Sequence, residues 1–147
     1  MHEVTTGVQI VLPQHCNGYK KPRLCGGQLM AGIDVIGAVA ARRYAQNAVT
    51  TACVDNLSFL NPAYLNDTVV QEAVVTWTGR TSLEVRVDSY VEQLDGTRKR
   101  VNRAYAVFVA LDDHDNPTPV PSFTPVTDAE KQEYAAALER RRMRLGK

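Results

Sequence analysis

One acidic residue in an otherwise uncharged stretch could carry chemistry. Asp34 is the only charged residue between Leu24 and Ala41. Aspartate is a poor residue for the interior of a helix, and a carboxylate is costly to bury without a partner. The pair Gly26-Gly27 lies about two helical turns earlier. Because glycines let a ligand approach the backbone, and the free N–H groups of a helix start bind negative charge, these residues supply two parts of an acyl-transfer site.

Two other interpretations of the polar residues stay open. Asp34 could face solvent or pair with a distant arginine, because structural ion pairs also bury carboxylates. Cys16 and Cys25, with His15 adjacent, invite a zinc site, but their spacing is wider than CxxC and a fourth ligand is missing. We therefore expect no metal, and we expect the three cysteines to be reduced cytosolic thiols.

A small set of elements must position these residues. Apolar residues recur at helical spacing from Gly26 to about Tyr44, which predicts one long helix. Alternation, turn residues and a capping box at Thr127 and Glu130 predict the remaining elements. These are a first strand at 5–12, strands at 49–60, 68–78, 82–92 and 101–111, and a tail helix at 128–143.

The strand patterns also predict which faces are buried. The strand at 82–92 alternates apolar and charged residues, which predicts a half-exposed antiparallel strand with Glu84, Arg86 and Asp88 facing outward. The strand at 101–111 is apolar on both sides, which places it inside the sheet. In the strand at 68–78 we expect Trp77 to share a face with Val75. The order predicts an α+β fold, with an antiparallel sheet against one long helix and a second helix at the C-terminus.

Composition narrows the class of protein. The chain has 147 residues, which fits one domain, and we expect that domain at 1–125 and a helical tail at 126–147. The formal net charge of +1 gives no reason to expect nucleic acid as a partner. The charge of Asp34 at the middle of the apolar run disfavours a membrane span. The N-terminus lacks the basic-then-apolar pattern of a secretory signal, so we expect a cytoplasmic protein.

Four segments, in order along the chain, resemble the hotdog-fold acyl-CoA thioesterases. Asn17 followed by residues 26–34, GGQLMAGID, is similar to the family signature Asn…Gly-Gly-x-x-Met-x-x-x-Asp. Residues 50–62 end in a similar Phe-x-x-Pro, residues 78–85 contain a similar Gly-Arg-Thr-Ser hairpin, and residues 106–121 resemble the last strand and its exit. The loop that follows Asn17 is about two residues longer than in the bacterial short- to medium-chain and mammalian brain enzymes that the chain resembles.

The resemblance implies a fold and a reaction. The fold is an antiparallel sheet wrapped around one long central helix, and the reaction is hydrolysis of an acyl-CoA to a carboxylic acid and CoA. Asp34 would be the general base or the nucleophile, the N–H of Gly27 would polarise the thioester carbonyl, and Asn17 would orient the water or the carbonyl across a dimer interface. The resemblance implies no metal or redox cofactor, and a homodimer or a dimer-based tetramer or hexamer.

A second group of residues would hold the CoA phosphates, which need cations and free N–H groups. We assign this role to the hairpin of Gly79, Arg80, Thr81 and Ser82, with Gly26 as a further substrate contact. The arginines at 140–144 either extend this track or are simply favoured by the dipole at a helix C-terminus.

Two other functions within the same fold remain as alternatives. One is a non-catalytic protein that binds acyl-CoA or regulates in response to it, which the altered loop after Asn17 would suit. The other is a hotdog dehydratase, which would need a histidine as its general base. His15 is the only candidate for that base near the site, and it lies in a loop.

Overall fold

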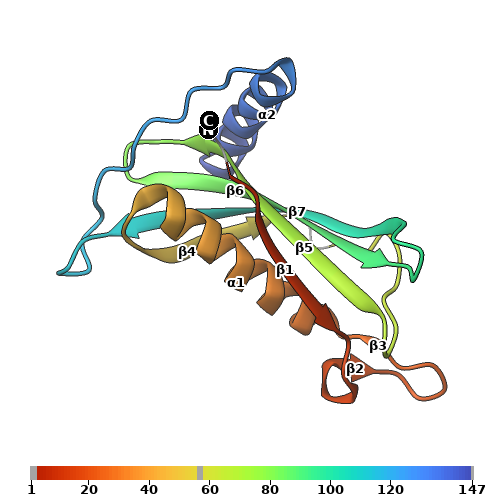
Figure 1. The fold of residues 1–147 in the computed structure, drawn as a ribbon. Helices are drawn as coiled ribbons and strands as arrows, with labels where there is room; N and C mark the ends of the chain where they lie inside the picture. Colours follow the sequence, from red (N-terminus) through yellow and green to blue (C-terminus); the bar gives the residue numbers. More distant parts are fainter. Residues whose placement is uncertain (1–2, 56–57, 147) are drawn as a thin grey trace.

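A five-stranded antiparallel sheet is the framework of the protein, which was analysed as a computed structural model describing residues 3–55 and 58–146. The strand order is β1-β5-β6-β7-β4, and the sheet curls around the long helix α1 (Figure 1). The strands are β1 (Thr5–Ile10), β4 (Ala48–Asp55), β5 (Thr68–Thr78), β6 (Ser82–Glu92) and β7 (Arg98–Leu111). A 3₁₀ turn, η1 (Pro13–His15), precedes a small separate hairpin formed by β2 (Cys16–Asn17) and β3 (Arg23–Leu24).

The central helix α1 (Gly26–Ala45) has the predicted position and length. Its buried residues recur at three- and four-residue steps, so one stripe of the helix packs against the sheet. These residues are Leu29, Ile33, Gly37, Ala40, Ala41 and Ala45. Gly37 lies against the ring of Phe108 in β7, which shows how closely the helix approaches the sheet. The helix ends at Gln46, which adopts the left-handed conformation that commonly closes a helix.

Two strand predictions are confirmed at both ends, and three need correction. β1 begins at Thr5 as predicted but ends at Ile10, two residues earlier than predicted. β5 and β6 begin and end at the predicted residues. β4 stops at Asp55, so Ser58, Phe59 and Leu60 are not in a strand, and residues 56 and 57 of the predicted strand lie outside the described residues. β7 begins three residues earlier than predicted, at Arg98, because Arg98 pairs with Glu92 and Glu72 and extends the hairpin. β7 is buried on both faces and lies between β6 and β4, as predicted.

The prediction that Trp77 shares a face with Val75 is wrong. Val75 is opposite Val85, but the register shifts after Val75, so that Trp77 is opposite Glu84. A β-bulge adds one residue to a strand and reverses the alternation beyond it. Trp77 is therefore buried on the side of the sheet away from α1, where Arg141 lies 5.2 Å from the centre of its ring.

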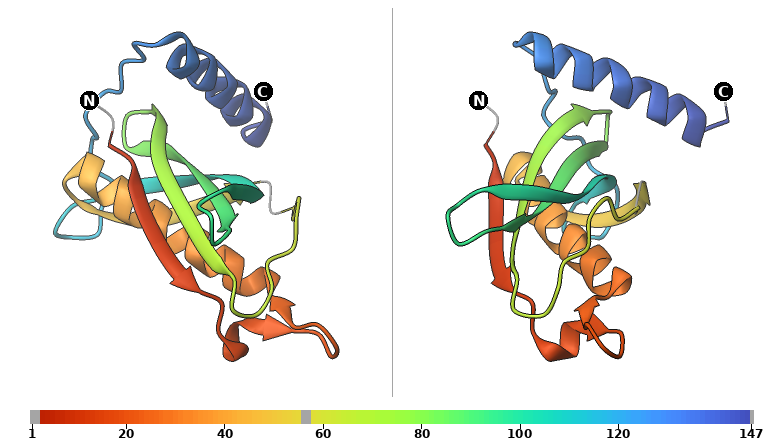
Figure 2. Two further views of the ribbon diagram at one scale, coloured as in Figure 1. Left: turned by 45° about the vertical axis from the view of Figure 1, so that its right-hand side comes forward. Right: turned by 90° about the vertical axis from the view of Figure 1, so that its right-hand side faces the viewer.

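The outer face of β6 is also covered, contrary to the half-exposed strand that the alternation predicted. Helix α2 (Asp128–Arg144) lies on the side of the sheet opposite to α1 (Figure 2). Under it Glu84 is fully buried, and farther along β6 Asp88 is only 4% exposed and is paired with Arg103 of β7. The predicted capping box of Thr127 and Glu130 is present at the start of α2. Within the described ranges, neither helix has the length and apolar content needed to cross a membrane.

Candidate active site

The carboxylate of Asp34 is held by a hydroxyl from the edge of the sheet. Thr51 of β4 donates a hydrogen bond from Oγ1 to Oδ1 of Asp34, at 2.5 Å. Asp34 is half-buried, and Thr51 is exposed on an edge strand. The hydrogen bond fixes one carboxylate oxygen and leaves Oδ2 available to a water molecule or a substrate. The two structural alternatives open from the sequence were a carboxylate free in solvent and one paired with an arginine. Asp34 is instead bonded to Thr51, and no ion pair with an arginine is found among the residues that the structure describes.

The start of α1 presents unused backbone donors. The first hydrogen bond of the helix runs from the N–H of Leu29 to the carbonyl of Cys25, so the N–H groups of Gly26, Gly27 and Gln28 precede the helical ladder. The N-cap residue Cys25 adds no side-chain cap. Gly26 and Gly27 are both exposed. Free N–H groups at a helix start are suited to binding negative charge, and the predicted role of Gly27 depends on this property.

The two parts of the predicted site lie on one side of α1 but at different heights. Asp34 lies seven positions after Gly27, which is nearly two full turns and about 10 Å along the helix axis. The side that they share is apolar and uncovered, because Met30 and Val35 are 42% and 59% exposed. An exposed apolar face around one carboxylate is the kind of surface that another chain covers.

The predicted third member, Asn17, lies in the β2–β3 hairpin beyond the start of α1 (Figure 1). It pairs with Arg23, and it is exposed. The hairpin is tied to the helix start by a backbone hydrogen bond from Cys25 N–H to the carbonyl of His15. Within the part of the chain that the structure describes, no hydrogen bond joins Asn17 to Asp34, so one chain alone does not assemble the three predicted catalytic residues.

The predicted CoA-binding hairpin opens onto a cavity of about 520 Å³. The β5–β6 turn contributes Arg80, Thr81 and Ser82 to its walls, and Gly79 donates its N–H to the carbonyl of Ser82 to close the turn. β4 contributes Ala52 and Cys53 on a second side. The remaining walls come from β7 and α2, and they include Val107, Val109, Arg141, Arg144 and Leu145.

Burial and charge act on Cys53 in this cavity. Burial raises the pKa of the Cys53 thiol above its ordinary value, while the positive charge of Arg144 acts in the opposite direction. Cys16, Cys25 and Cys53 are free thiols. His15 uses its Nδ1 to accept a hydrogen bond from Leu12 N–H. In the described ranges, no three histidine, cysteine, aspartate or glutamate side chains gather as they would around a metal ion.

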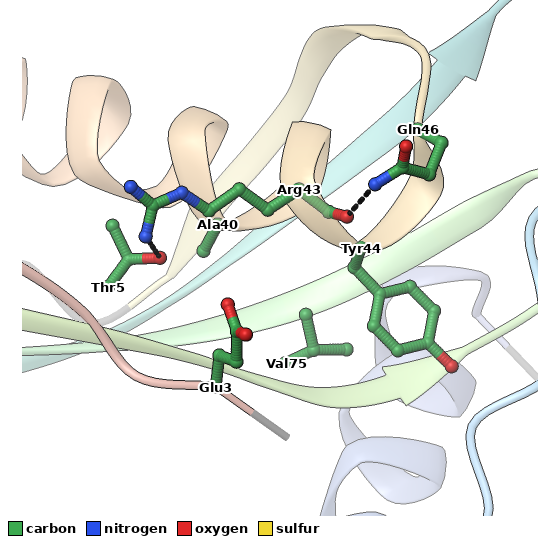
Figure 3. Close-up of a pocket in the computed structure, with 7 residues that line it drawn as sticks. All are labelled: Glu3, Thr5, Ala40, Arg43, Tyr44, Gln46 and Val75. Carbon is green, nitrogen blue, oxygen red and sulfur yellow. Dashed lines mark hydrogen bonds between the residues drawn. The ribbon is translucent and has the colours of Figure 1, made fainter. Parts of the chain in front are cut away.

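A separate cavity lies at the opposite end of α1 (Figure 3). It measures about 460 Å³, and residues such as Glu3, Tyr44 and Val75 line it. Arg43 donates from Nη1 to Oγ1 of Thr5 across it, at 3.4 Å. Because it is at the C-terminal end of the helix, it shares no residue with the helix start or with Asp34.

Thr51 is the residue that the sequence analysis missed. A threonine in a strand gives no functional signal by itself, because β-branched residues are common in strands on either face. The available signal was indirect, since a half-buried carboxylate needs a donor and the strand after the helix is the nearest source of one. The structure also places Arg141 and Arg144 in the cavity of Arg80, and sequence spacing had left their role open.

Comparison with known proteins places these features in a family. The family model described as "Thioesterase superfamily" matches residues 23–96. The chain is 37% identical to the uncharacterized acyl-CoA thioester hydrolase YkhA of Bacillus subtilis, over 88% of this chain and 75% of that protein. It is 30% identical to the acetyl-coenzyme A thioesterase of Mus musculus over 95% of this chain, but spans only 26% of that longer protein.

Solved structures agree over nearly the whole chain. A hexameric acyl-CoA thioesterase is 35% identical with a TM-score of 0.86, covering 97% of this chain and 91% of that one. An acyl-CoA hydrolase from Staphylococcus aureus, in complex with butyryl coenzyme A, coenzyme A and coenzyme A disulfide, is 34% identical with a TM-score of 0.83, covering 96% and 87%.

Other structures of the Staphylococcus aureus enzyme carry alanine in place of one asparagine, one aspartate or one threonine. In that enzyme the aspartate and the threonine are 17 residues apart, and the asparagine precedes the aspartate by 15.

Proposed function

We propose, given that this chain belongs to the thioesterase superfamily and within it to the hotdog-fold acyl-CoA thioesterases, that it hydrolyses an acyl-CoA thioester to a free carboxylic acid and CoA. The observation that carries the proposal is the hydrogen bond from Thr51 to Asp34 on an exposed, otherwise apolar face of α1. The spacing of these two residues, 17 positions, equals the spacing of the aspartate and threonine that were replaced in the Staphylococcus aureus hydrolase.

Asp34 would act on the attacking group. With Oδ1 held by Thr51, Oδ2 either removes a proton from water as a general base or attacks the thioester carbonyl as a nucleophile. The N–H of Gly27 would stabilise the oxyanion that forms in either case. No step in this scheme draws on a metal or a redox cofactor.

The site would be completed by a second copy of the chain. A reacting carbonyl must lie about 3 Å from both the attacking group and the oxyanion donors. Gly27 and Asp34 of one chain are too far apart along α1 for that, so the donor for one Asp34 would come from the partner's helix start. The exposed Met30 and Val35 flank Asp34 and would be covered in the same contact. We therefore propose a homodimer, or a tetramer or hexamer built from it.

Asn17 would also act across this contact. Its separation from Asp34 is two residues longer than the corresponding separation in the Staphylococcus aureus enzyme, 17 against 15. The extra residues fall in the turn of the β2–β3 hairpin, where Gly18 has a φ of 102° that suits glycine. A longer hairpin turn leaves the strand that carries Asn17 in place, which is compatible with a role for its amide in orienting the water or the carbonyl.

The CoA end of the substrate would lie in the cavity beside Arg80. The guanidinium and the hydroxyls of Thr81 and Ser82 offer charge-assisted and neutral hydrogen bonds to phosphate oxygens.

A cytoplasmic location remains the expectation from the sequence.

Release of CoA from a panel of acyl-CoAs tests the proposal. Wild-type protein should release CoA from at least one chain length, and Asp34→Asn should lose at least about 10²-fold in kcat, the usual worth of a general base. Asp113→Asn, an exposed aspartate far along the chain, is the matched control. Circular dichroism and sedimentation establish that each variant is folded and assembled. Tight acyl-CoA binding without any CoA release would instead favour a non-catalytic binding protein.

A further inference from the structure

We propose that α2 is a phosphate-binding arm of the active site, in which Arg141 and Arg144 face Arg80 and a buried Glu84–Arg140 ion pair holds the arm in position. The proposal rests on the proposed function, because it takes CoA as the ligand. It adds two binding residues and two positioning residues to those identified from the sequence.

The carboxylate of this ion pair is buried, and both of its oxygens accept hydrogen bonds from Arg140. Arg140 donates from Nε and Nη2 to the two carboxylate oxygens of Glu84, each at 2.9 Å. Glu84 has no exposed surface, and it also accepts from Oγ1 of Thr76 at 2.6 Å. A two-pronged contact of this kind fixes orientation as well as distance. Arg140 thus locks the rotation of α2 about its own axis at this point.

A second contact fixes the helix about two turns earlier. Glu133 accepts hydrogen bonds from the hydroxyl of Tyr105 at 3.0 Å and from Nη1 of Arg86 at 3.1 Å. The Arg140 guanidinium lies 3.6 Å from the centre of the Tyr105 ring, so the two contacts share one side chain of the sheet. Residues seven apart lie on the same side of a helix, so both ion pairs hold one stripe of α2 against the sheet.

Polar contacts carry an unusual share of this docking. Ala137 is the one buried residue of α2, and Tyr134 stacks on Phe123 with 6.1 Å between the rings. A surface helix is normally held by a wide apolar stripe. Because that stripe is nearly absent here, the position of α2 depends on Glu84 and Glu133.

The docked helix α2 places two arginine side chains in the cavity of Arg80. Arg141 and Arg144 are one turn apart, and both line the cavity together with Arg80, Thr81 and Ser82. Arg144 lies 3.5 Å from Asp55, and Arg141 lies over the Trp77 ring, so each guanidinium has a defined place. Arg80, Arg141 and Arg144 outnumber the nearby carboxylate of Asp55, and the Glu84 carboxylate is already paired with Arg140, so the cavity carries a positive charge. CoA carries a diphosphate and a ribose phosphate, which match such a cluster.

The first test compares substrates with and without phosphates. For Arg141→Ala/Arg144→Ala we expect KM for an acyl-CoA to rise about 10- to 150-fold, the range for hydrogen bonds to charged groups, with kcat within about twofold. The KM for the same acyl group on pantetheine, which has no phosphates, should not change. Arg142→Ala is the control, because Arg142 pairs with Glu139 on the outer side of the helix and does not line the cavity.

The second test separates positioning from contact. Arg140→Met alone would leave the buried Glu84 carboxylate without its cationic partner and could unfold the protein. The variant is therefore Glu84→Gln/Arg140→Met, which removes both charges and keeps an acceptor for the Thr76 hydroxyl. It should raise KM for acyl-CoA although Arg141 and Arg144 are intact, with unchanged kcat on the pantetheine substrate. Arg140→Lys keeps the charge but cannot form the two parallel hydrogen bonds to Glu84. Its KM for acyl-CoA should lie between those of this variant and wild type.

Calorimetric binding of free CoA makes the outcome independent of hydrolysis. Weaker CoA binding by both double variants supports the arm even if no acyl-CoA is hydrolysed. If wild-type protein hydrolyses acyl-CoA and both double variants keep its KM and its CoA affinity, the arm is refuted while the proposed function stands. If wild-type protein does not bind CoA, both fail. A rise in KM that is equal on the pantetheine substrate would show a general structural defect and also overturn the proposal.

Discussion

Thr51 and Asp34 are joined by a 2.5 Å hydrogen bond that links the edge of the sheet to the middle of the central helix. The contact sets the orientation of a carboxylate that would otherwise rotate freely on an exposed helix face. Orientation matters here because an attacking group that is displaced by about 1 Å can lose 10²-fold in rate. The threonine hydroxyl is therefore a positioning group for the proposed chemistry of Asp34.

Replacing Thr51 should affect kcat through its hydroxyl. Thr51→Val keeps the shape and the strand preference but removes the donor, and a hydrogen bond to a charged group is worth roughly 1.5–3 kcal/mol. We expect kcat to fall about 10- to 150-fold, measured by CoA release at saturating substrate. Thr51→Ser, which keeps the donor, should restore most of the rate. Equal activity of the valine variant and wild type would show that the hydrogen bond has no catalytic role.

Replacing Arg80 should affect binding of the CoA carrier. Arg80→Ala removes one charge-assisted contact made equally in the ground and transition states, so KM should rise about 10-fold or more with kcat nearly unchanged. The difference from wild type should shrink in high salt, because partly exposed contacts are screened. A matching loss of kcat on acyl-CoA and on acyl-pantetheine would move Arg80 to the catalytic centre or to the fold.

Cys53 should report both the charge and the occupancy of its cavity. Burial raises its thiol pKa, so less thiolate is present near neutral pH and alkylation by iodoacetamide should be slower than for a free cysteine, accelerating only at more alkaline pH. Arg144 lowers this pKa, so Arg144→Ala should move the pH profile further upward. The measurement uses protein with Cys16→Ser and Cys25→Ser.

Added CoA should slow alkylation of Cys53, because the thiol lines the cavity of Arg80. Alkylation that CoA leaves unchanged at every pH would place the ligand elsewhere.

A side chain at Gly37 of α1 should destabilise the protein by overpacking its core. A Cβ there would lie 3.0 Å from the ring of the fully buried Phe108. Overpacking of this kind typically destabilises by about 1–3 kcal/mol, which urea unfolding of Gly37→Ala would measure. In Gly37→Ala/Phe108→Leu the smaller side chain should relieve the clash, so the loss should be less than the sum of the single losses. Simple additivity would contradict the proposed contact.

The periodicity of apolar residues predicted the individual helices and strands well, but it did not predict which elements pack over them. The limits of α1, β5 and β6 follow from apolar spacing and turn residues, and the structure confirms them. The outer face of β6 looked solvated because Glu84 and Asp88 are charged. Their partners, Arg140 and Arg103, come from 56 and 15 residues away, and no local pattern indicates that pairing.

For the candidate site too, features local in the sequence were predicted and contacts between distant elements were not. Asp34 and the glycine pair were found because a charge and two glycines stand out in an apolar run. Thr51 was not found, because its role depends on a strand-to-helix contact that spans 17 residues. The face of Trp77 was predicted wrongly because a bulge leaves no mark in the alternation of Val75 and its neighbours.

β4, like β5, contains a register shift, and it lies between Thr51 and Cys53. The shift sends two neighbouring parts of this strand to different sides of the sheet. Thr51 is opposite Phe108 and reaches α1, whereas Cys53 is opposite Val107 and lines the cavity below α2. Without the extra residue Ala52, positions 51 and 53 would point the same way. A substrate that touches both the Asp34 carboxylate and the Arg80 cavity of one chain must therefore pass around the rim of the sheet at β4. The flexible pantetheine part of CoA would bend over that rim, and its length would set how far the thioester can lie from the phosphates.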